Sequence, residues 1–425
     1  MQFKLTKKEK SWIFYDVGNS AFVLMVSTIL PVYFNYLAQN AGVSDVDYLA
    51  YWGYAASIST LIVAVLGPVM GTLADTRGFK KPLFLSCILV GCASCLLMGL
   101  TTWWISFLVI FIIAKVGFNS SLVFYDSMLS DVTAPERMDR VSSSGYAWGY
   151  AGSCIPFIVS LVFVLGYQKM GFSFETGMMI AFAEVAVWWL PLMKQYRQVH
   201  YVERKPHAMR ESVGRIIETL RSVRKQKKIF LFLIAFFFFI DGVYTIIDMA
   251  TAYGSALGLD STGLLLALLV TQFVAFPFSI LFGRLAEKYD TGKLILTCIA
   301  AYTGITVFAV FMKAQWQFWV LAIFVGMFQG GIQALSRSYF AKIVPPERSG
   351  EYFGLMDICG KGASFMGTTV VGLASQAFGS INIGVSAIVF LFLAGALFFM
   401  KTEHSGSEST KNQENIVMRQ QMFHD

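Results

Sequence analysis

The chain has 425 residues, of which 56% are hydrophobic and only 14% are charged, whereas a soluble globular chain carries about 25% charged residues. A soluble core cannot absorb this much apolar surface, so the composition excludes an ordinary soluble enzyme or binding domain. The formal net charge is +7. The basic residues that produce it lie in loops between apolar stretches, so this charge does not indicate binding to nucleic acid.

Apolar stretches of roughly 20 residues recur along the chain, and each can cross about 30 Å of hydrocarbon as a helix. The first stretch is too long for a signal-peptide core and has no convincing cleavage site, so we interpret it as a retained span. The chain is therefore expected to be an all-α polytopic membrane protein with twelve spans. These are residues 12–38, 48–73, 82–101, 103–128, 142–166 and 173–194, followed by 229–254, 261–283, 292–312, 316–340, 351–377 and 380–400.

Lysine and arginine residues gather on one side of these spans. That side receives the N-terminal segment, the C-terminal tail and the loops after the even-numbered spans, whereas the opposite loops carry only Lys169 and Lys313. The positive-inside rule makes the basic side cytoplasmic and places both termini there. Short loops favour a bacterial plasma membrane. A vacuolar membrane is the expectation if the source is eukaryotic.

The longest polar stretch, residues 195–228, lies between the two sets of six spans and is rich in Arg and Lys. We interpret it as a solvated basic linker, with an amphipathic surface helix that binds lipid headgroups as the alternative. The predicted organisation is a cytoplasmic N-terminus (1–11), an N-terminal six-helix bundle (12–194), the linker, a C-terminal six-helix bundle (229–400) and a disordered cytoplasmic tail (401–425).

Two short segments recur at matching places in the two halves. GTLADTRGFKK at 71–81 follows the second span, and GRLAEKYDTGK at 283–293 follows the eighth. APER at 134–137 follows the fourth span, and PPER at 345–348 follows the tenth. Because both pairs keep the same order and the same side, they indicate a parallel repeat about an axis along the membrane normal.

The 71–81 segment resembles the signature loop of the major facilitator superfamily, a G-x-L-A-D-x-x-G-x-K-K pattern, with Phe79 where that family usually has a basic residue. The resemblance implies two pseudo-symmetric six-helix bundles that carry a solute by alternating access. It also implies that Asp75 packs at the cytoplasmic seam between the halves, with Arg77 and Lys80 as the basic residues of the loop and Asp126 as their acidic partner.

A further resemblance covers nearly the whole chain. WIFYDVGNSAF at 12–22, FYDS at 124–127 and QALSRS at 333–338 are similar to a branch that contains vacuolar amino-acid effluxers and many bacterial relatives. Membership in this branch leaves the transported solute open. The three segments contribute Tyr15, Asp16, Asn19, Asp126, Gln333 and Arg337 to the candidate site.

Several charged residues fall inside predicted spans, where each costs at least about 2.5–3.5 kcal/mol and needs a partner or a task. At ~1.5 Å per residue, Lys115 lies roughly 17 Å beyond Trp104 and Asp241 roughly 20 Å beyond Lys228, so both are near mid-membrane. The family resemblance implies that spans 1, 4, 7 and 10 line the central cavity. We therefore rank Lys115 and Asp241 first as solute or coupling groups.

Other candidates follow with other interpretations. Glu184 lies midway along a peripheral span, and Asn119 lies one turn beyond Lys115. Asp357 and Lys361 are four residues apart and can neutralise each other within one helix. Asp16 lies one turn inside the membrane, where a structural acid and a coupling group are both possible, and its counterpart in the second half is predicted to be Asp241.

Three GxxxG patterns let helices approach closely, at 67–71, 145–149 and 326–330. We predict that they form sliding surfaces between the halves. The sequence shows no persuasive metal, nucleotide or Ser/His/Asp pattern, so we expect no cofactor and no enzyme activity. All four His residues lie in loops or the tail, which leaves carboxylates as the groups to carry protons.

The preferred interpretation is a secondary transporter of a small polar solute, such as an amino acid or organic anion, coupled to protons through intramembrane carboxylates. The alternative is a lipid flippase on the same fold. The expected partners are the solute, protons and membrane lipids, and the chain is expected to act as a monomer.

Overall fold

A computed structural model describes residues 3–43, 45–75, 78–190, 221–378 and 380–422. Twelve long helices lie in these ranges, in the order and places of the predicted spans. The first half contains α1 (Lys7–Asn40), α2 (Asp45–Ala74), α3 (Lys80–Leu100), α4 (Trp104–Ser127), α6 (Met138–Gly166) and α7 (Phe174–Trp189). The second half contains α9 (Lys227–Ala256), α10 (Ser261–Leu285), α11 (Thr291–Val310), α12 (Gln315–Ile343), α13 (Ser349–Phe378) and α14 (Ile381–Met422).

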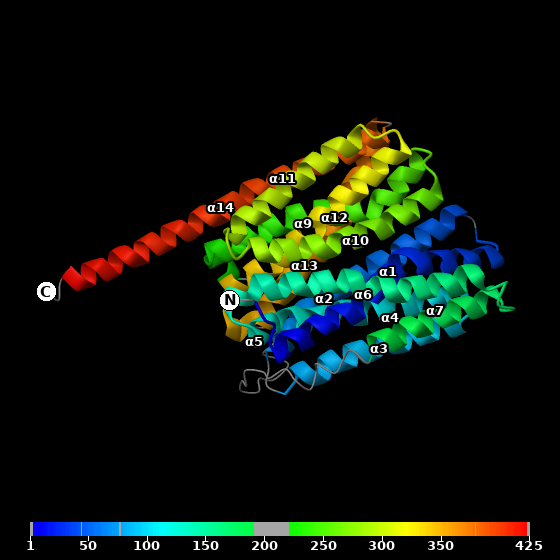
Figure 1. The fold of residues 1–425 in the computed structure, drawn as a ribbon, viewed down its shortest axis with the longest axis horizontal. Coiled ribbons are helices and arrows are strands. Elements are labelled where there is room, and N and C mark those ends of the chain that lie inside the picture. Colours follow the sequence, from blue (N-terminus) through cyan, green and yellow to red (C-terminus); the bar gives the residue numbers. More distant parts are fainter. Residues whose placement is uncertain (1–2, 44, 76–77, 191–220, 379, 423–425) are drawn as a thin grey trace.

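The helices of the first half, blue to green, and those of the second half, green to red, lie side by side as two bundles in Figure 1. Ten candidate membrane spans, judged by length and hydropathy, occur in the described parts of the chain. The predicted all-α membrane fold is confirmed, and ten of the twelve long helices in the described residues qualify as candidate spans. Helices satisfy their own backbone hydrogen bonds, which is the condition for crossing lipid.

Helix ends differ from the predicted spans where polar side chains extend a helix into water. The first helix begins at Lys7 instead of residue 12, because Thr6 and Glu9 form a capping box at its start. At the starts of α10 and α11, the N-cap side chains of Asp260 and Asp290 each accept one backbone N–H group.

The disordered tail predicted for 401–425 differs from the structure. The last helix, α14, continues to Met422 and projects beyond the bundle (Figure 1). The sequence from 401 onward has no Pro and only one Gly, so nothing interrupts the backbone hydrogen bonds that the membrane span begins. Most of the predicted linker, residues 195–220, lies outside the described residues.

The repeated turns after the fourth and tenth spans take the same form. Pro135–Arg137 and Pro346–Arg348 each make a single 3₁₀ turn, η1 and η3, immediately before α6 and α13. A short helix, α5 (Leu129–Val132), precedes η1. The local geometry thus repeats with the sequence, as a duplicated fold requires.

Only one of the three GxxxG patterns lies mainly between the halves. A Cβ atom at Gly71 of α2 would lie 2.3 Å from the carbonyl oxygen of Gly350 on α13. Gly145 of α6 instead packs against α1 of its own half, where an added Cβ would meet Trp12 at 3.1 Å. A Cβ at Gly326 of α12 would meet α10 within the second half. Each of these two patterns also meets the opposite half, since a Cβ at Gly145 would lie 3.1 Å from Arg337 Nη2 and a Cβ at Gly330 would lie 2.9 Å from the Tyr150 ring. These glycines therefore serve close packing within a bundle as well as between the halves.

Candidate functional site: a buried ionic network between the halves

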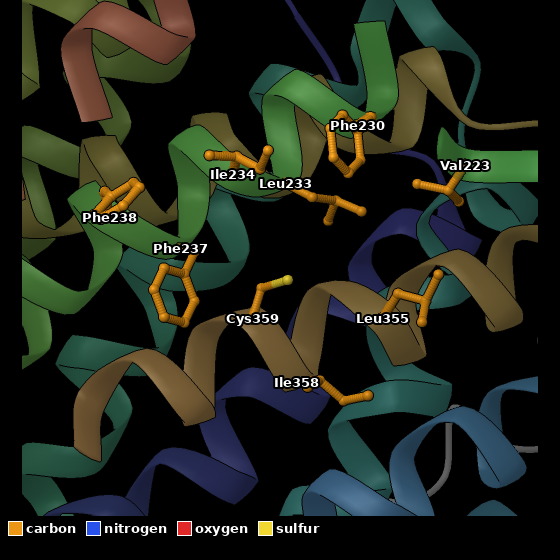
Figure 2. A pocket seen from close by; sticks show the side chains of 9 residues that line it. All are labelled: Val223, Phe230, Leu233, Ile234, Phe237, Phe238, Leu355, Ile358 and Cys359. Carbon is orange, nitrogen blue, oxygen red and sulfur yellow. The ribbon is translucent and has the colours of Figure 1, made fainter. Parts of the chain in front are cut away.

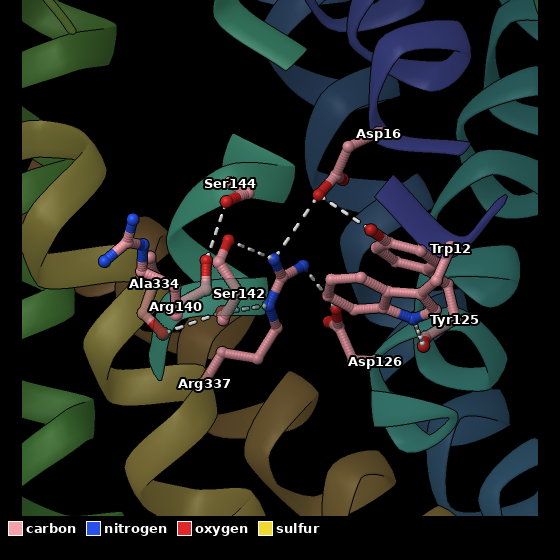
Figure 3. A network of polar contacts seen from close by, with 9 residues as sticks. All are labelled: Trp12, Asp16, Tyr125, Asp126, Arg140, Ser142, Ser144, Ala334 and Arg337. Carbon is pink, nitrogen blue, oxygen red and sulfur yellow. Dashed lines mark hydrogen bonds and ion pairs between the residues drawn. The ribbon is translucent and has the colours of Figure 1, made fainter. Parts of the chain in front are cut away.

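Arg337 of α12 crosses from the second half into the first (Figure 3). Its Nη1 donates to Asp126 Oδ1 at 3.0 Å, and its Nη2 donates to Asp16 Oδ2 at 3.3 Å. The Nε donates to Ser142 Oγ at 2.9 Å, and Nη2 also donates to the Ser142 carbonyl at 3.1 Å. Helices α1, α4 and α6 thus each supply an acceptor for one guanidinium, whose fixed fork of donors suits such an arrangement.

Aromatic rings enclose the same guanidinium. The Arg337 Cζ lies 4.6 Å from the Trp12 ring centre and 4.4 Å from the Tyr146 ring centre, distances at which a cation is attracted to a ring face. Trp12 stacks on Tyr125 with 4.4 Å between centres, and the Tyr125 hydroxyl donates to Asp16 Oδ2 at 2.8 Å. The Arg337 residue is only 3% exposed. The cation is therefore held by charge, hydrogen bonds and ring faces together.

Gly145 leaves the space that the network occupies. A Cβ atom there would lie 2.5 Å from Asp16 Oδ2 and 3.1 Å from Arg337 Nη2. No side chain other than hydrogen can be placed at this position without moving the ion pair.

The two members of the central ion pair hold equivalent places in the repeat. Asp126 lies eleven residues before Arg137, and Arg337 lies eleven residues before Arg348 of the second Pro-Glu-Arg turn. The pseudo-twofold axis therefore brings an acid and a base from matching positions together. We did not identify this pairing from the sequence, although the equal spacing to the two turns was a signal that could have found it.

A second polar cluster joins the halves nearby. Asp139 of α6 accepts hydrogen bonds from Ser338 Oγ at 2.6 Å and Thr291 Oγ1 at 2.8 Å, and it pairs with Lys342 at 2.5 Å. These three partners belong to the second half. None of these cluster residues was a sequence candidate, since each lies near a helix end where polar residues are ordinary.

Two further contacts repeat the symmetry. Asp75, which directly follows α2, accepts the backbone N–H groups of Gly350 and Glu351 at 3.0 and 2.9 Å. Glu287, at the matching place of the second repeat, pairs with Arg140 near the start of α6 at 2.6 Å. Each signature loop thus contacts the first turn of a helix in the other half.

The Asp75 carboxyl group has a raised pKa. Desolvation raises the pKa of its carboxyl to about 6, although the charge of Lys80 and the two backbone N–H groups of α13 lower it. The carboxyl group therefore changes protonation near neutral pH at this seam.

The described partner of Lys80 differs from the prediction. Lys80 forms an ion pair with Asp131 of α5 at 2.8 Å, whereas Asp126 contacts Arg337. The short helix after α4 brings Asp131, and not Asp126, beside the loop. Arg77 lies outside the described residues.

Asp241 has surroundings unlike those of Asp16. It is 0% exposed, and its Oδ1 accepts the Gly367 N–H at 2.9 Å and the Thr245 hydroxyl at 3.3 Å. Both donors belong to the second half, and Oδ2 has no hydrogen-bond partner among the described residues. The described contacts of Asp241 do not include Lys115.

The other predicted residues are spread over the first half and the seam. Lys115 is half-buried, with Nζ 5.8 Å from the Phe111 ring centre. The Tyr15 hydroxyl donates to Ser121 at 2.7 Å, and Ser160 donates to Glu184 at 3.1 Å.

The remaining candidates have these places. Asn19 and Asn119 are buried and Gln333 is half-buried. Asp357 faces α2, since its Oδ2 would lie 3.7 Å from a Cβ atom at Gly67. The Lys361 side chain lies outside the described residues, so its predicted pair with Asp357 stays a prediction. Among the described residues, no group of three or more His, Cys, Asp or Glu side chains could hold a metal ion.

Comparisons with known proteins agree with this architecture. The family model described as "Vacuole effluxer Atg22 like" matches residues 5–136 and 130–411. An "Uncharacterized MFS-type transporter YxiO" of Bacillus subtilis is 40% identical and covers 98% of this chain and 99% of its own. The "Autophagy-related protein 22" of Coccidioides immitis is 23% identical over 82% of this chain and 71% of its own.

Solved structures share the fold at low identity. The human organic anion transporter MFSD10 superposes with a TM-score of 0.70 at 12% identity, covering 93% of this chain and 100% of its own. The major facilitator transporter FucP in its outward conformation gives a TM-score of 0.69 at 11% identity, covering 93% and 97%. The chain is thus a multi-pass membrane transporter of the major facilitator type, and it belongs to the family of Atg22-like vacuole effluxers.

Proposed function

We propose that the chain moves a small polar solute by alternating access, and that the Arg337 network locks the state closed at the predicted cytoplasmic side. The observation that carries the proposal is the place of the ionic contacts. Arg337 with Asp16 and Asp126, Asp139 with Lys342, and Glu287 with Arg140 all join the two halves.

These contacts lie at one end of the bundle, where α1, α6 and α13 begin and where α2, α4 and α12 end. The basic loops predict that this end is cytoplasmic. A transporter that opens there must break these contacts together. The described arrangement therefore supports a state that is closed toward the predicted cytoplasmic side.

The charge of the network supports proton coupling. One guanidinium faces two carboxylates, so the cluster has one negative charge in excess when both acids are ionised. An uncompensated buried charge is costly, and a proton on one carboxylate removes it. The Asp126 side chain is 29% exposed, whereas that of Asp16 is 9% exposed. The greater exposure of Asp126 favours it as the acid that exchanges a proton with water. Asp16 shares Arg337 with Asp126, so its interaction with Arg337 depends on whether Asp126 is protonated.

The solute is proposed to carry an anionic group, which Lys115 on α4 would attract. The half-buried Lys115 keeps this role in our proposal, whereas the contacts of Asp241 favour a packing role in the described state. The name of the family model, a vacuole effluxer, supports export as the direction of transport. The close relative from Bacillus subtilis favours a bacterial plasma membrane.

Uptake by proteoliposomes tests the proposal. Purified protein is reconstituted and screened with amino acids, peptides, sugars, organic anions and fluorescent lipids, with and without a pH gradient. We expect at least one polar solute to be transported and the gradient to accelerate it. Transport of lipid alone would favour the flippase alternative. Solute uptake at the same rate with and without a pH gradient would exclude proton coupling.

A further inference from the structure

An apolar groove of about 460 Å³ lies between the first three turns of α9 and the second and third turns of α13 (Figure 2). The α9 wall runs from Phe230 to Phe238, and the α13 wall contains Leu355, Ile358 and Cys359. Val223, from the helical turn that precedes α9, closes one end. All nine lining side chains are apolar, and the volume lies in the range of ligand-binding cavities, about 300–1,000 Å³. The groove therefore suits a hydrocarbon chain and not the polar solute.

The groove is accessible from the outer surface of the protein. Phe230 is 36% exposed, and Ile234 and Phe237 are only half-buried. At the far end, Phe238 stacks on Phe398 of α14 with 5.8 Å between ring centres. Because these helices cross the membrane, the surroundings of such an opening are lipid tails.

Basic side chains surround the end of the groove that faces the predicted cytoplasm. Arg221, Arg224, Lys225 and Lys227 are all exposed. Arg224 follows Val223 directly, and Lys227 lies one turn before Phe230 on the same face of α9. No acidic residue occurs between Arg221 and Ile240, so no carboxylate in this segment offsets the cluster.

We propose that this groove binds an anionic phospholipid of the predicted cytoplasmic leaflet, with one acyl chain between α9 and α13 and the phosphate beside Arg224 and Lys227. Apolar walls select a hydrocarbon chain, and the basic rim selects a negative headgroup over a zwitterionic one. The lipid would tie the end of the linker to α13, whose first turn contacts Asp75 of the other half. This site is separate from the Arg337 network and does not depend on which solute is transported.

Photocrosslinking from inside the groove identifies the occupant. Benzoylphenylalanine replaces Phe230 in the full-length protein, which is reconstituted in vesicles containing equal amounts of phosphatidylglycerol and phosphatidylcholine. The same replacement at Phe390 of α14, which is 72% exposed, is the matched control for ordinary lipid contact. We expect phosphatidylglycerol adducts to predominate at position 230 and both lipids to react alike at position 390.

Other products would overturn the proposal. Crosslinks from position 230 to residues 191–220 of the same chain would make the linker the occupant, and crosslinks to a second copy would make the groove an oligomer interface. Equal reaction with both lipids at position 230 would reduce the groove to ordinary lipid-facing surface.

Charge variants test the headgroup contact. In the Phe230-labelled protein, R224Q combined with K227Q should lower the preference for phosphatidylglycerol by about fivefold for each side chain removed. K288Q combined with K293Q removes two exposed basic residues from the same predicted side and should leave the preference unchanged. A preference that survives R224Q/K227Q, or that falls equally in the control, would contradict the assigned phosphate position.

Discussion

Asp16 and Asp241 are acids of the first helix of each half, and the two carboxylates have different surroundings. Asp16 bonds to Arg337 of the other half and to Tyr125. Asp241 bonds to Gly367 and Thr245 within its own half. Both lie against a glycine, since a Cβ at Gly145 or Gly367 would approach the carboxylate to 2.5 or 2.3 Å. The two acids nevertheless lie at different depths, because Asp16 is 24 residues before the end of α1 at Asn40 and Asp241 is 15 residues before the end of α9 at Ala256. The predicted equivalence of Asp16 and Asp241 was therefore wrong, and one acid joins the halves whereas the other joins two helices of one half.

The largest expected effect comes from removing the cation that distinguishes Asp16 from Asp241. R337Q leaves Asp16 and Asp126 without their guanidinium, and removing one partner of a buried ion pair costs about 3–5 kcal/mol. We expect solute uptake by proteoliposomes to fall by about 100-fold or more. Distances between spin labels across the predicted cytoplasmic side should increase in the same variant. R284Q, at an exposed position of α10, is the control, and unchanged distances in R337Q would exclude the proposed lock.

Neutralising each acid in turn sharpens the comparison. D16N removes a charged acceptor of Arg337, and hydrogen bonds to charged groups contribute about 1.5–3 kcal/mol, so uptake should fall by about 10-fold or more. In D241N the amide oxygen still accepts the Gly367 N–H, and we expect uptake within about threefold of the parent. Uptake rates with and without a pH gradient measure both. If D241N lost as much gradient-driven uptake as D16N, Asp241 would have to take part in proton coupling.

Filling the space beside Asp16 should have a smaller effect. G145A places a methyl carbon 2.5 Å from Asp16 Oδ2, and overpacking of this kind costs about 1–3 kcal/mol. We expect a lower thermal stability of the purified protein and about 10-fold slower uptake. G304A on α11 is the matched control, because a Cβ there meets nothing within 4 Å. A fully active, equally stable G145A would show that the network tolerates displacement.

The smallest effect should be a dependence of the closed state on pH through Asp75. The carboxyl has a pKa of about 6 at the seam and returns to about 3.9 when the seam opens into water. The closed state therefore binds a proton that the open state releases between about pH 4 and pH 6, and acidification within this window favours closure. Label distances across the seam should shorten from pH 7 to pH 5, by a few-fold change in population. D75N should abolish this component, and a pH response identical in D75N would assign it to another group.

The helices and the place of Asp75 could be predicted from the sequence, but the contacts between the charged residues could not. Hydropathy and the repeated turns predicted the helices, because about 20 apolar residues in a row can only cross lipid as a helix. The family resemblance placed Asp75 at the seam, where the structure finds it against α13. Asp16, Asp126 and Arg337 were all candidates, but as separate charges and not as one cluster. Asp139, which has three partners in the second half, was missed.

The sequence by itself determined the membrane class, the helix order and the duplication, since these depend on composition, period and spacing along one chain. Only the tertiary structure decided which charges meet. Helices in lipid are apolar on most faces, so the pattern within a helix does not say which face meets which neighbour. Docking of the two halves forms the ion pair between Arg337 and Asp126, and packing within the second half forms the hydrogen bond between the Gly367 N–H and Asp241. The difference between Asp16 and Asp241 therefore arises from three-dimensional contacts that no linear spacing records.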